Sequence, residues 1–428
     1  MLLPKIAPNL TFPTRGVKID ALIFHESYGK GRINMRTDLL TYYRQARERL
    51  LAQCVCCGKC VANCRAYPWI PSPPDPREAQ RGILAYLRGA PQLSDPARRK
   101  IAACMRCYGC ADIRCPAGVD SLLINELVLR EGELRKEKPF DLENYPVQDA
   151  LARRFTTPEE YARITTPVLR PDADTLFFPG CNVYKQPEKL LAALDLLDAT
   201  GRPYSFVPGL SHCCGQMPQA GRGGAEYLQQ KADALIDVIQ KSGAKTVVFW
   251  CPTCLVTLSA RIEKYRALPF EPLSFAAYLL RYADRLHFSC AQPKTVTLHD
   301  PCKAVYMGLE QESVRKLLSL VPGTRLVEMA HHGKDALCCG CASVGAVTGT
   351  QMDVGDRVTE ARVQEARDSG ADTLISVCHN CHLVFARYNA AHPDHPMPVE
   401  NYACYLLAAM GKRREDTAPA QALLPGTP

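Results

Sequence analysis

The 428-residue sequence contains 22 cysteines, most of which fall into closely spaced groups. Thiolates bind soft metals, so such groups indicate metal centres or, in an oxidising compartment, disulfides. The first group, QCVCCGKCVANC, has the spacing C-x2-C-x2-C-x3-C over Cys54, Cys57, Cys60 and Cys64. One tight turn can then place three thiolates on a cubane [4Fe–4S] cluster, while the fourth leaves on a helix. Cys56 rivals Cys57 for a ligand position, and we interpret it as a small buried apolar residue.

A second group, CMRCYGCADIRCP, repeats this spacing with a last gap of four residues instead of three. In two-cluster ferredoxins the fourth cysteine of each run binds the other cluster. A structural zinc site needs only four ligands and leaves the third close cysteine of each run without a role. We therefore predict two cubane clusters, one held by Cys54, Cys57, Cys60 and Cys115, the other by Cys104, Cys107, Cys110 and Cys64.

The second half of the chain carries its cysteines in two similar units, each with a single cysteine, a Cys-Cys-Gly and a Cys-x2-Cys. Five thiolates per unit, two of them adjacent, indicate a larger or less regular iron–sulfur unit than a cubane. We expect Gly215 and Gly340 to remove side-chain bulk where a cluster approaches the backbone. The five cysteines are Cys181, Cys213, Cys214, Cys251 and Cys254 in the first unit, and Cys302, Cys338, Cys339, Cys378 and Cys381 in the second.

Hydrophobic periodicity predicts the elements that position these cysteines. A helix is expected over 36–51, before the first run, and short apolar runs alternate with helical stretches from residue 174. Alternating strands and helices predict mostly parallel sheets with helical crossovers. The first and last cysteines of each unit then follow the carboxyl ends of strands, where open α/β sheets collect ligands. The expected strands are TLFF, PYSFVP and TVVFW in the first unit, and TVTLH, TRLVEMA and TLISV in the second.

The fold class predicted from these patterns is a combination of α+β and α/β: a helical ferredoxin-like domain, then two repeated α/β domains related by a pseudo-twofold axis. The division that we expect is an N-terminal extension (1–45), the ferredoxin-like domain (46–120), a helical linker (121–172), the first repeat (173–290), the second repeat (291–410) and a disordered tail (411–428).

Composition excludes several classes of protein. With 47% apolar and 22% charged residues the chain is globular, and its apolar runs are too short for a signal peptide or a membrane span. We expect a cytoplasmic protein with reduced cysteines. The formal charge of +8 does not predict nucleic-acid binding, because two clusters of charge about −2 would offset half of it. Cations that could offset cluster charge are Lys59, Arg65, Arg106, Arg114, Lys185 and Lys303.

The pattern of the second half resembles the CCG-domain iron–sulfur proteins, and the chain from about residue 45 resembles the heterodisulfide reductase D family. The match covers eighteen of the 22 cysteines and leaves out Cys56, Cys290, Cys341 and Cys404. The resemblance implies a noncubane [4Fe–4S] cluster on the five cysteines of each complete unit. The longer last gap of the second unit, and the extra thiol of Cys341, leave the type of its cluster open.

The resemblance also implies a reaction. Electrons would pass through the cubane clusters to the noncubane clusters, where a disulfide or persulfide is cleaved or formed. Protons could come from histidines near the CCG motifs: His212, His299, His331, His332, His379 and His382. The run Cys378-His379-Asn380-Cys381-His382 could also bind zinc, although its place in the repeat argues against this.

No flavin or nicotinamide motif is evident, so electrons must be exchanged with a partner. The family implies a membrane cytochrome b subunit or a flavoprotein as that partner, and a small thiol, disulfide or sulfur-carrier protein as substrate. Such a partner could attach the chain to the inner face of the membrane. The alternative is an electron-transfer subunit of a flavin-dependent 2-hydroxyacid or glycerol-3-phosphate dehydrogenase, with no substrate site of its own.

Overall fold

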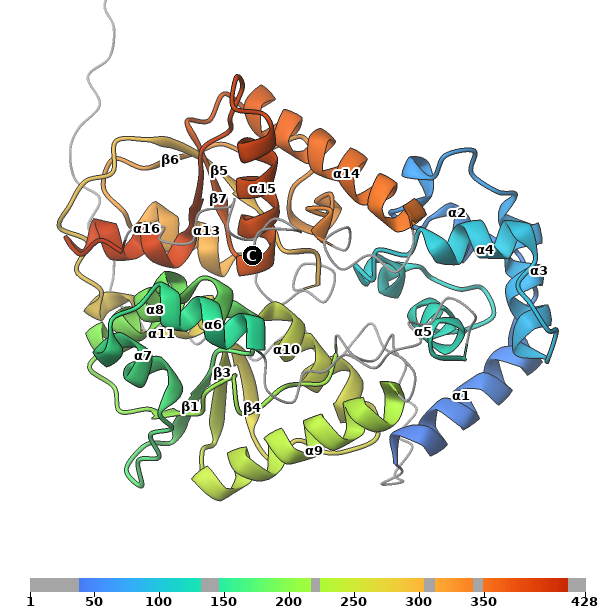
Figure 1. The fold of residues 1–428 in the computed structure, drawn as a ribbon, viewed down its shortest axis with the longest axis horizontal. Helices are drawn as coiled ribbons and strands as arrows, with labels where there is room; N and C mark the ends of the chain where they lie inside the picture. The colour runs from blue at the N-terminus through green and yellow to red at the C-terminus, as the bar shows by residue number, and fades with distance from the viewer. Residues whose placement is uncertain (1–37, 132–145, 217–223, 304–311, 342–348, 415–428) are drawn as a thin grey trace, which may run out of the picture. The chain divides into compact units, whose positions relative to one another are not determined.

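A computed structural model describes residues 38–131, 146–216, 224–303, 312–341 and 349–414. Most of the expected N-terminal extension and of the expected tail lies outside these residues. The described residues all belong to one compact unit of the chain, Thr37–Pro428. They comprise a helical part that carries the first two cysteine runs, followed by two parallel sheets (Figure 1).

The helical part begins with α1, which starts one residue after Asp38. The Asp38 carboxylate accepts a hydrogen bond from the backbone N–H of Thr41 at 2.8 Å and so caps the helix. This helix confirms the one expected over 36–51, within the described residues. The elements of this part are α1 (Leu39–Gln53), α2 (Lys59–Ala62), η1 (Tyr67–Trp69), α3 (Pro76–Leu87), α4 (Asp95–Ala102), η2 (Gly109–Asp112) and α5 (Ser121–Glu131).

Two helices lie between this part and the first sheet, where the sequence predicts a helical linker. Both begin with a proline at the first helical position, where its missing N–H leaves no hydrogen bond unmade. The second is also closed by a capping box, in which Thr157 and Glu160 bond to each other's backbone N–H groups. The two helices are α6 (Pro146–Arg154) and α7 (Pro158–Thr165).

The first repeat is a four-stranded parallel sheet in the order β2-β1-β3-β4. Its two central strands are buried along nearly their whole length, as the apolar runs TLFF and TVVF require. Its elements are β1 (Thr175–Phe178), η3 (Asn182–Lys185), α8 (Pro187–Ala199), β2 (Ser205–Phe206), α9 (Gly224–Ser242), β3 (Thr246–Phe249), α10 (Pro252–Val256), the π-helix η5 (Thr257–Arg261), η6 (Ile262–Lys264), β4 (Glu271–Ser274), α11 (Phe275–Arg281) and η7 (Ala283–Arg285).

The second repeat has the same topology, with the order β6-β5-β7-β8 and all strand pairs parallel. The six strands expected from the sequence are all present, and each sheet has a fourth strand that the sequence does not predict. Its elements are β5 (Thr295–His299), α13 (Ser313–Ser319), β6 (Arg325–Leu326), η8 (Gly333–Asp335), α14 (Gly349–Asp368), β7 (Thr373–Ser376), α15 (His379–Ala391), β8 (Val399–Asn401) and α16 (Tyr402–Ala409).

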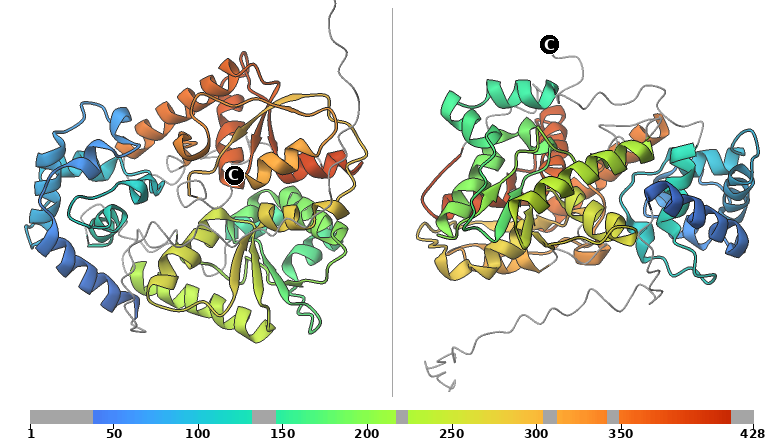
Figure 2. Two further views of the ribbon diagram at one scale, coloured as in Figure 1. Left: turned by 180° about the vertical axis from the view of Figure 1, so that it is seen from behind. Right: turned by 90° about the horizontal axis from the view of Figure 1, so that it is seen from below.

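Four helices lie between the two sheets, as the views in Figures 1 and 2 show. Helix α8 of the first repeat packs on α16 of the second, and α13 of the second packs on α11 of the first. Helices α8 and α13 follow the first strand of their repeats, whereas α11 and α16 follow the last strand. Each contact therefore pairs the earlier helix of one repeat with the later helix of the other, so the two contacts are reciprocal. This reciprocity is what the expected pseudo-twofold relation requires.

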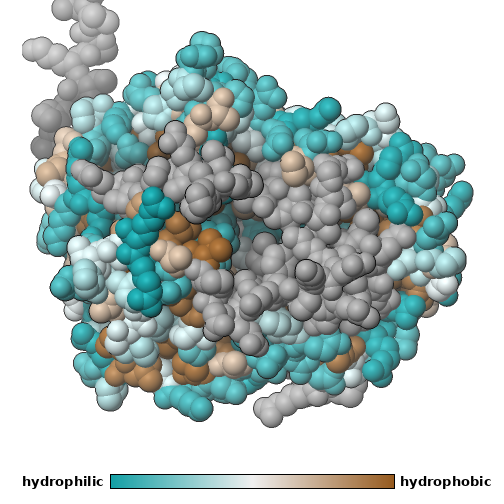
Figure 3. Space-filling view, in the orientation of Figure 1, coloured by the Kyte–Doolittle hydropathy of each residue, from teal (hydrophilic) through white to brown (hydrophobic). Residues whose placement is uncertain are grey.

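Among the described residues, no helix is both long and apolar enough to cross a bilayer. On the face drawn in Figure 3, hydrophobic residues occur in small groups among hydrophilic ones. Large exposed apolar side chains are few in the described residues and spread along the chain: Val55, Val147, Val168, Leu169, Leu320 and Met352. Isolated exposed apolar residues of this kind are normal for a protein surface.

Candidate iron–sulfur sites

The first two cysteine runs form two separate four-cysteine cavities. One cavity is lined by Cys54, Cys57, Cys60 and Cys115. The other is lined by Cys64, Cys104, Cys107 and Cys110. The structure therefore brings the cysteines together in the crossed groups that the tandem motif predicts, with the fourth cysteine of each run at the other cavity.

Polar side chains of neighbouring helices contact the sulfurs of these cavities. Gln80 of α3 donates from its amide to Cys54 Sγ at 3.6 Å, and its carbonyl oxygen accepts from Cys60 Sγ at 3.1 Å. Asn125 of α5 donates to Cys110 Sγ at 3.8 Å. Burial raises the pKa of the Cys60 thiol to about 12, because a thiolate is poorly solvated there and other sulfurs lie close by. The iron of a cluster would supply the positive charge that a thiolate needs.

Lys100 of α4 is a buried cation beside both cavities, with only 2% of its surface exposed. Burial acts to lower the pKa of its ammonium group, but the surrounding cysteines, Cys64 foremost, raise it above the ordinary value. Lys100 is not among the six cations that the sequence offers for this role, of which two lie near these cavities in the sequence and are exposed. Lys59 is exposed and Arg114 is exposed as well, whereas Lys100 is enclosed by the helices on which α4 packs.

The two runs share one backbone conformation around their second cysteine. The residues on either side of Cys57, Cys56 and Gly58, have φ of 53° and 77°. In the second run the equivalent residues, Arg106 and Tyr108, have φ of 48° and 67°. Left-handed backbone at residues other than glycine is strained and concentrates at ligand sites. Cys56, interpreted from the sequence as a small buried apolar residue, is partly buried against the main hydrophobic core and occupies this turn position.

The five cysteines of the first repeat converge at the carboxyl edge of its sheet. Cys181 follows β1, and its Sγ lies 3.8 Å from Cys213 Sγ. Cys214 contacts Cys254, which in turn contacts Cys251. A hydrogen bond from Cys254, helped by backbone N–H groups at the start of α10, lowers the pKa of Cys251 to about 7. The thiol of Cys251 therefore loses its proton more readily than an ordinary cysteine and can bind metal as a thiolate.

The second repeat assembles the same set of sulfurs. Cys302 contacts Cys338, and Cys381 contacts both Cys339 and Cys378. In both repeats the glycine of the Cys-Cys-Gly motif donates its backbone N–H to the first cysteine of that motif, at 3.3 Å to Cys213 Sγ and 3.4 Å to Cys338 Sγ. The extra thiol of the second repeat, Cys341, lies against Cys339.

The packing of helices supplies a reason for the two motif glycines that the sequence does not predict. Gly215 and Gly340 have φ of 77° and 83°, and a Cβ at either would collide with a helix instead of a cluster. At Gly215 it would lie 2.7 Å from Leu228 Cα of α9, and at Gly340 it would lie 2.3 Å from the Gly355 carbonyl of α14. The glycine that approaches the sulfurs is Gly180, where a Cβ would lie 3.0 Å from Cys254 Sγ.

The four groups of cysteines lie close enough to influence one another. Cys107 of the second cavity faces Cys338 of the second repeat, and the two belong to one buried cluster. Cys251 of the first repeat raises the pKa of Cys378 of the second, after the larger effects of Cys381 and of burial. Tyr108, next to Cys107, is in turn within electrostatic range of Cys214. The helical part thus contacts the second CCG site and lies within electrostatic range of the first, and the two CCG sites influence each other electrostatically.

The six candidate histidines divide by environment. His331 and His332 are exposed and His212 is half-buried, with its pKa lowered by burial. His379 is buried and accepts a hydrogen bond from Trp250 Nε1 at 3.3 Å on its Nδ1. Burial lowers the pKa of His379 to about 3, so it is neutral at physiological pH and cannot act as an imidazolium acid.

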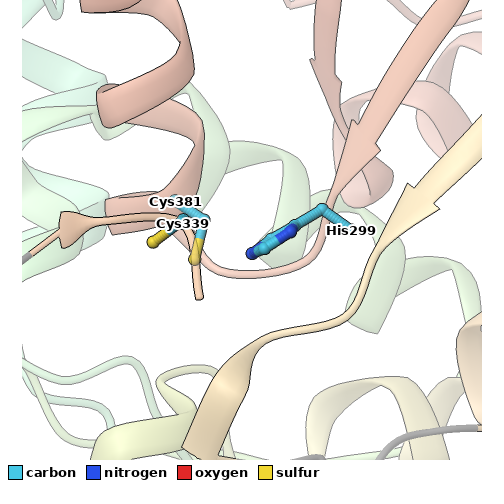
Figure 4. Close-up of side chains that lie close together, drawn as sticks. All are labelled: His299, Cys339 and Cys381. Carbon is cyan, nitrogen blue, oxygen red and sulfur yellow. The ribbon is translucent and has the colours of Figure 1, made fainter. Parts of the chain in front are cut away.

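His299 and His382, the remaining two, are also buried. His382 pairs with Ser376 Oγ at 3.2 Å. The ligand atoms of His299, Cys339 and Cys381 all lie within 4.8 Å of one another. Figure 4 draws these three side chains, which place an imidazole nitrogen beside two sulfurs of the second CCG site.

The donor set fits iron–sulfur clusters. Two four-sulfur cavities and two five-sulfur sites are lined by buried or half-buried thiols, and only a bound cation would stabilise several of them together as thiolates. Iron is a metal that such all-sulfur sites hold. Which of these cysteines bind iron is a proposal that rests on this convergence.

Comparison with known proteins identifies the same parts of the chain. The 4Fe-4S dicluster domain family matches residues 53–120, and the cysteine-rich domain family, CCG, matches residues 175–259 and 296–386. In Methanosarcina barkeri, the subunit named D of the dihydromethanophenazine:CoB–CoM heterodisulfide reductase is 28% identical over 370 residues, which cover 77% of this chain and 87% of that protein.

Two other relatives have different names. The probable iron-sulfur-binding oxidoreductase FadF of Bacillus subtilis is 23% identical, over 83% of this chain and 58% of that protein. Lactate utilization protein A of an Exiguobacterium species is 25% identical, over 49% of this chain and 83% of that protein. Together with the two domain matches and the four groups of converging cysteines, these relatives identify the chain as an iron–sulfur protein with a 4Fe-4S dicluster domain followed by two CCG domains, related to heterodisulfide reductase D.

Proposed function

We propose that the chain is the catalytic iron–sulfur subunit of a heterodisulfide-reductase-like complex, which cleaves or forms a disulfide or persulfide between its two CCG sites. The observation that carries this proposal is that both repeats present a complete set of five cysteines and that hydrogen bonds join the two Cys-x2-Cys regions. Trp250, next to Cys251, donates to His379, next to Cys378, at 3.3 Å. Cleaving a disulfide takes two electrons and produces two thiolates. Two facing sites can hold one sulfur each.

The clusters, when bound, would supply single electrons and iron atoms that bind sulfur. The chain's own residues would hold and shield this chemistry. We assign the two cubane sites to Cys54, Cys57, Cys60 and Cys115 and to Cys104, Cys107, Cys110 and Cys64, and the noncubane sites to the five cysteines of each repeat. Contact of Cys107 with Cys338 supports electron entry to the CCG sites from the helical part.

Lys303 supports the proposal that thiolates form between the repeats. It belongs to the second repeat, yet its Nζ donates to Thr253 Oγ1 of the first repeat at 3.3 Å, within the Cys-x2-Cys loop. Its charge contributes to the lowered pKa of Cys251, after the hydrogen bonds of Cys254 and of the backbone. A cation here would stabilise a product thiolate as the S–S bond breaks.

The same proposal needs an electron partner, which we infer to be a membrane cytochrome b subunit or a flavoprotein, and a small thiol, disulfide or sulfur-carrier protein as substrate. The name of the Methanosarcina barkeri relative, which begins with dihydromethanophenazine, supports a complex of this kind. Attachment to the inner face of the membrane would then come through the partner.

A second candidate function is an electron-transfer subunit with no substrate site, as in a flavin-dependent dehydrogenase of 2-hydroxyacids or glycerol 3-phosphate. The relatives named FadF and lactate utilization protein A favour it. A pure relay, however, gains nothing from two facing sets of five thiolates.

The test is the iron and acid-labile sulfide content of protein purified without oxygen, with electron paramagnetic resonance (EPR) before and after addition of a thiol. The proposal predicts about sixteen iron atoms per chain, four clusters of four, and a new EPR signal on oxidation with thiol. Cys254→Ser should remove that signal, whereas Cys290→Ser, at an exposed cysteine outside every site, should keep it. About eight iron atoms per chain and no change of the EPR signal with thiol would contradict this proposal and support the electron-transfer subunit instead.

A further inference from the structure

A buried imidazole nitrogen faces the sulfurs of the second CCG site. His299 ends β5 and has no measurable exposure, and one nitrogen of its ring points toward Cys339 and Cys381 (Figure 4). This nitrogen, Nε2, has no hydrogen-bond partner among the oxygen and nitrogen atoms of the described residues, whereas the His299 side chain interacts with the Cys381 thiol. A buried polar atom without a partner costs free energy, so the cysteine sulfurs that Nε2 faces are the partners available to it.

The other ring nitrogen fixes which of the two carries the proton. Arg362 of α14 donates from Nε to His299 Nδ1 at 3.1 Å. A guanidinium group only donates, so Nδ1 must accept and is unprotonated. Nε2 then carries the hydrogen of the neutral ring and is a donor. A donor nitrogen cannot also bind iron through a lone pair, which makes His299 an N–H···S donor and not a metal ligand.

Arg362 is itself held firmly. Its side chain is fully buried, and Nη1 donates to the Glu365 carboxylate and to the His331 carbonyl, both at 2.6 Å. The edge of the His299 ring also packs against Phe385 of α15, with ring centroids 4.9 Å apart. The orientation of the imidazole is therefore set by neighbours on two helices.

The first repeat has no counterpart of His299 and Arg362. His299 stands three residues before Cys302, and the residue three before Cys181 is Phe178. Arg362 stands sixteen residues before Cys378, and the residue sixteen before Cys251 is Leu235. Both replacements are fully buried apolar side chains. The two sites thus share their sulfurs but differ in the surroundings of those sulfurs.

We propose that His299, held as its Nε2–H tautomer by Arg362, donates a hydrogen bond to the cysteine sulfurs of the second CCG site and makes a cluster bound there easier to reduce than the one in the first repeat. Hydrogen bonds to sulfur disperse the negative charge gained on reduction, and so raise the potential of an iron–sulfur centre. Arg362 is a positioning residue in this arrangement. The inference rests on the proposed occupancy of both CCG sites by clusters.

The test compares two replacements of His299 in anaerobically purified, cluster-loaded protein. His299→Phe places the first repeat's residue in the second and removes the donor, whereas His299→Gln keeps an amide N–H near the place of Nε2. His395→Phe changes an exposed histidine of the same repeat and serves as control. Iron is counted first, and the midpoint potential of each cluster is then measured by EPR at controlled potentials.

We expect His299→Phe to lower the potential of one cluster by a tenfold change in its reduction equilibrium, about 59 mV for one electron. His299→Gln should recover most of that shift, and His395→Phe should cause none. An unchanged potential in His299→Phe with full iron content, or equal shifts in the Phe and Gln variants, would overturn the inference.

A measurement on the unmodified protein does not depend on the folding of a variant. With 15N-labelled histidine, pulsed EPR should detect a weak nitrogen coupling to a cluster, as expected across a hydrogen bond. A strong coupling would show that His299 binds iron directly, and the absence of any coupling would show that it does not contact a cluster. Either result overturns the inference. A total iron count near eight would instead be a failure of the proposed function, which the iron analysis detects separately.

Discussion

Basic side chains and one imidazole beside the cysteines, more than the cysteines themselves, distinguish the four sites at the scale of single residues. Lys100 lies beside both four-cysteine cavities, Lys303 lies beside Cys251, and the second CCG site has His299 with Arg362 behind it. A buried charge is costly unless a partner of opposite charge is present. Lys100 therefore indicates where negative charge accumulates when the sulfurs hold iron, whereas Arg362 has its partner of opposite charge in Glu365.

Lys100→Met should make both cubane clusters harder to reduce. Removing a positive charge from a buried position destabilises the reduced, more negative state, and two unit charges about 8 Å apart interact by ~2 kcal/mol at an effective dielectric constant of about 20. We expect a shift of tens of millivolts to lower potential, measured by EPR at controlled potentials. The matched control is Lys59→Met, the same change at an exposed lysine of the first run. Equal shifts in the two variants would contradict an electrostatic role for Lys100.

The cysteine partition could be predicted from the sequence, whereas these charges could not. The spacing of a cysteine run restricts which thiolates reach one cluster, so the crossed groups with Cys115 and Cys64 follow from the tandem motif. Lys100 stands four residues before Cys104, but it reaches both cavities only because α4 packs on α3 and α5. Arg362 reaches the second CCG site from α14 in the same way. Lys59 lies beside the first run in the sequence and is exposed, which shows that nearness in sequence does not give burial.

At the scale of elements, helices α9 and α14 hold the Cys-Cys-Gly loops in place. In the second repeat Thr359 of α14 donates to the Cys339 carbonyl at 2.8 Å and to the Gly355 carbonyl at 2.9 Å. The glycine after the cysteine pair lets the loop lie directly on the helix, since a Cβ at Gly340 would be 2.1 Å from Thr359 Oγ1. The helix therefore determines where the adjacent thiols point.

Gly340→Ala should destabilise the protein far more than a strained glycine elsewhere in the same repeat. Gly370 also has a positive φ, of 70°, but no atom lies within 4 Å of a Cβ built there, so Gly370→Ala costs only the backbone strain of ~1–2 kcal/mol. At Gly340 the overlap with α14 adds to that strain, and we expect ~3 kcal/mol or more. Thermal unfolding of the anaerobic protein, followed by circular dichroism, measures both. Similar melting temperatures for the two variants would show that contact with α14 is unimportant.

Strands differ in how well their sequences predict them. Strands β1, β3, β5 and β7 are central and buried, so their apolar runs are clear. The edge strands β4 and β8, with the sequences EPLS and VEN, are partly exposed and have no apolar run. They form because the chain must return to the edge of the sheet before it enters α11 and α16. This requirement comes from the topology and not from the local sequence.

At the scale of the whole molecule, the order of contacts supports the proposed electron path. The two four-cysteine cavities share Lys100, the second cavity meets the second repeat through Cys107 and Cys338, and the repeats meet through the hydrogen bond from Trp250 to His379. Electron transfer needs the helical part to stay fixed against both repeats. The residues that fix it are therefore as necessary to the proposed function as the ligands.

Arg261 joins the helical part to the first repeat. It ends the π-helix η5, is buried, and donates to Tyr43 Oη of α1 at 2.6 Å and to Tyr108 Oη at 3.2 Å. It also forms a buried ion pair with Glu126 of α5. Single-turn π-bulges often occur at functional sites, and here one directs a guanidinium group into the neighbouring part of the chain.

Arg261→Met should weaken the contact between the helical part and the first repeat, because it leaves the Glu126 carboxylate buried without a partner. We expect the free energy of unfolding to fall by about 3–5 kcal/mol. The matched control is Lys264→Met, three residues further on, which breaks the partly exposed pair with Asp120 and should cost at most about 1 kcal/mol. Thermal unfolding gives the stabilities, and limited proteolysis detects separation of the two parts.

If Arg261→Met loses no more stability than Lys264→Met and resists protease equally, other residues hold the helical part against the first repeat. If it loses stability but keeps all its iron, reduction of the CCG clusters by a donor that first reduces the cubanes should slow, since the gap between Cys107 and Cys338 would no longer be held closed.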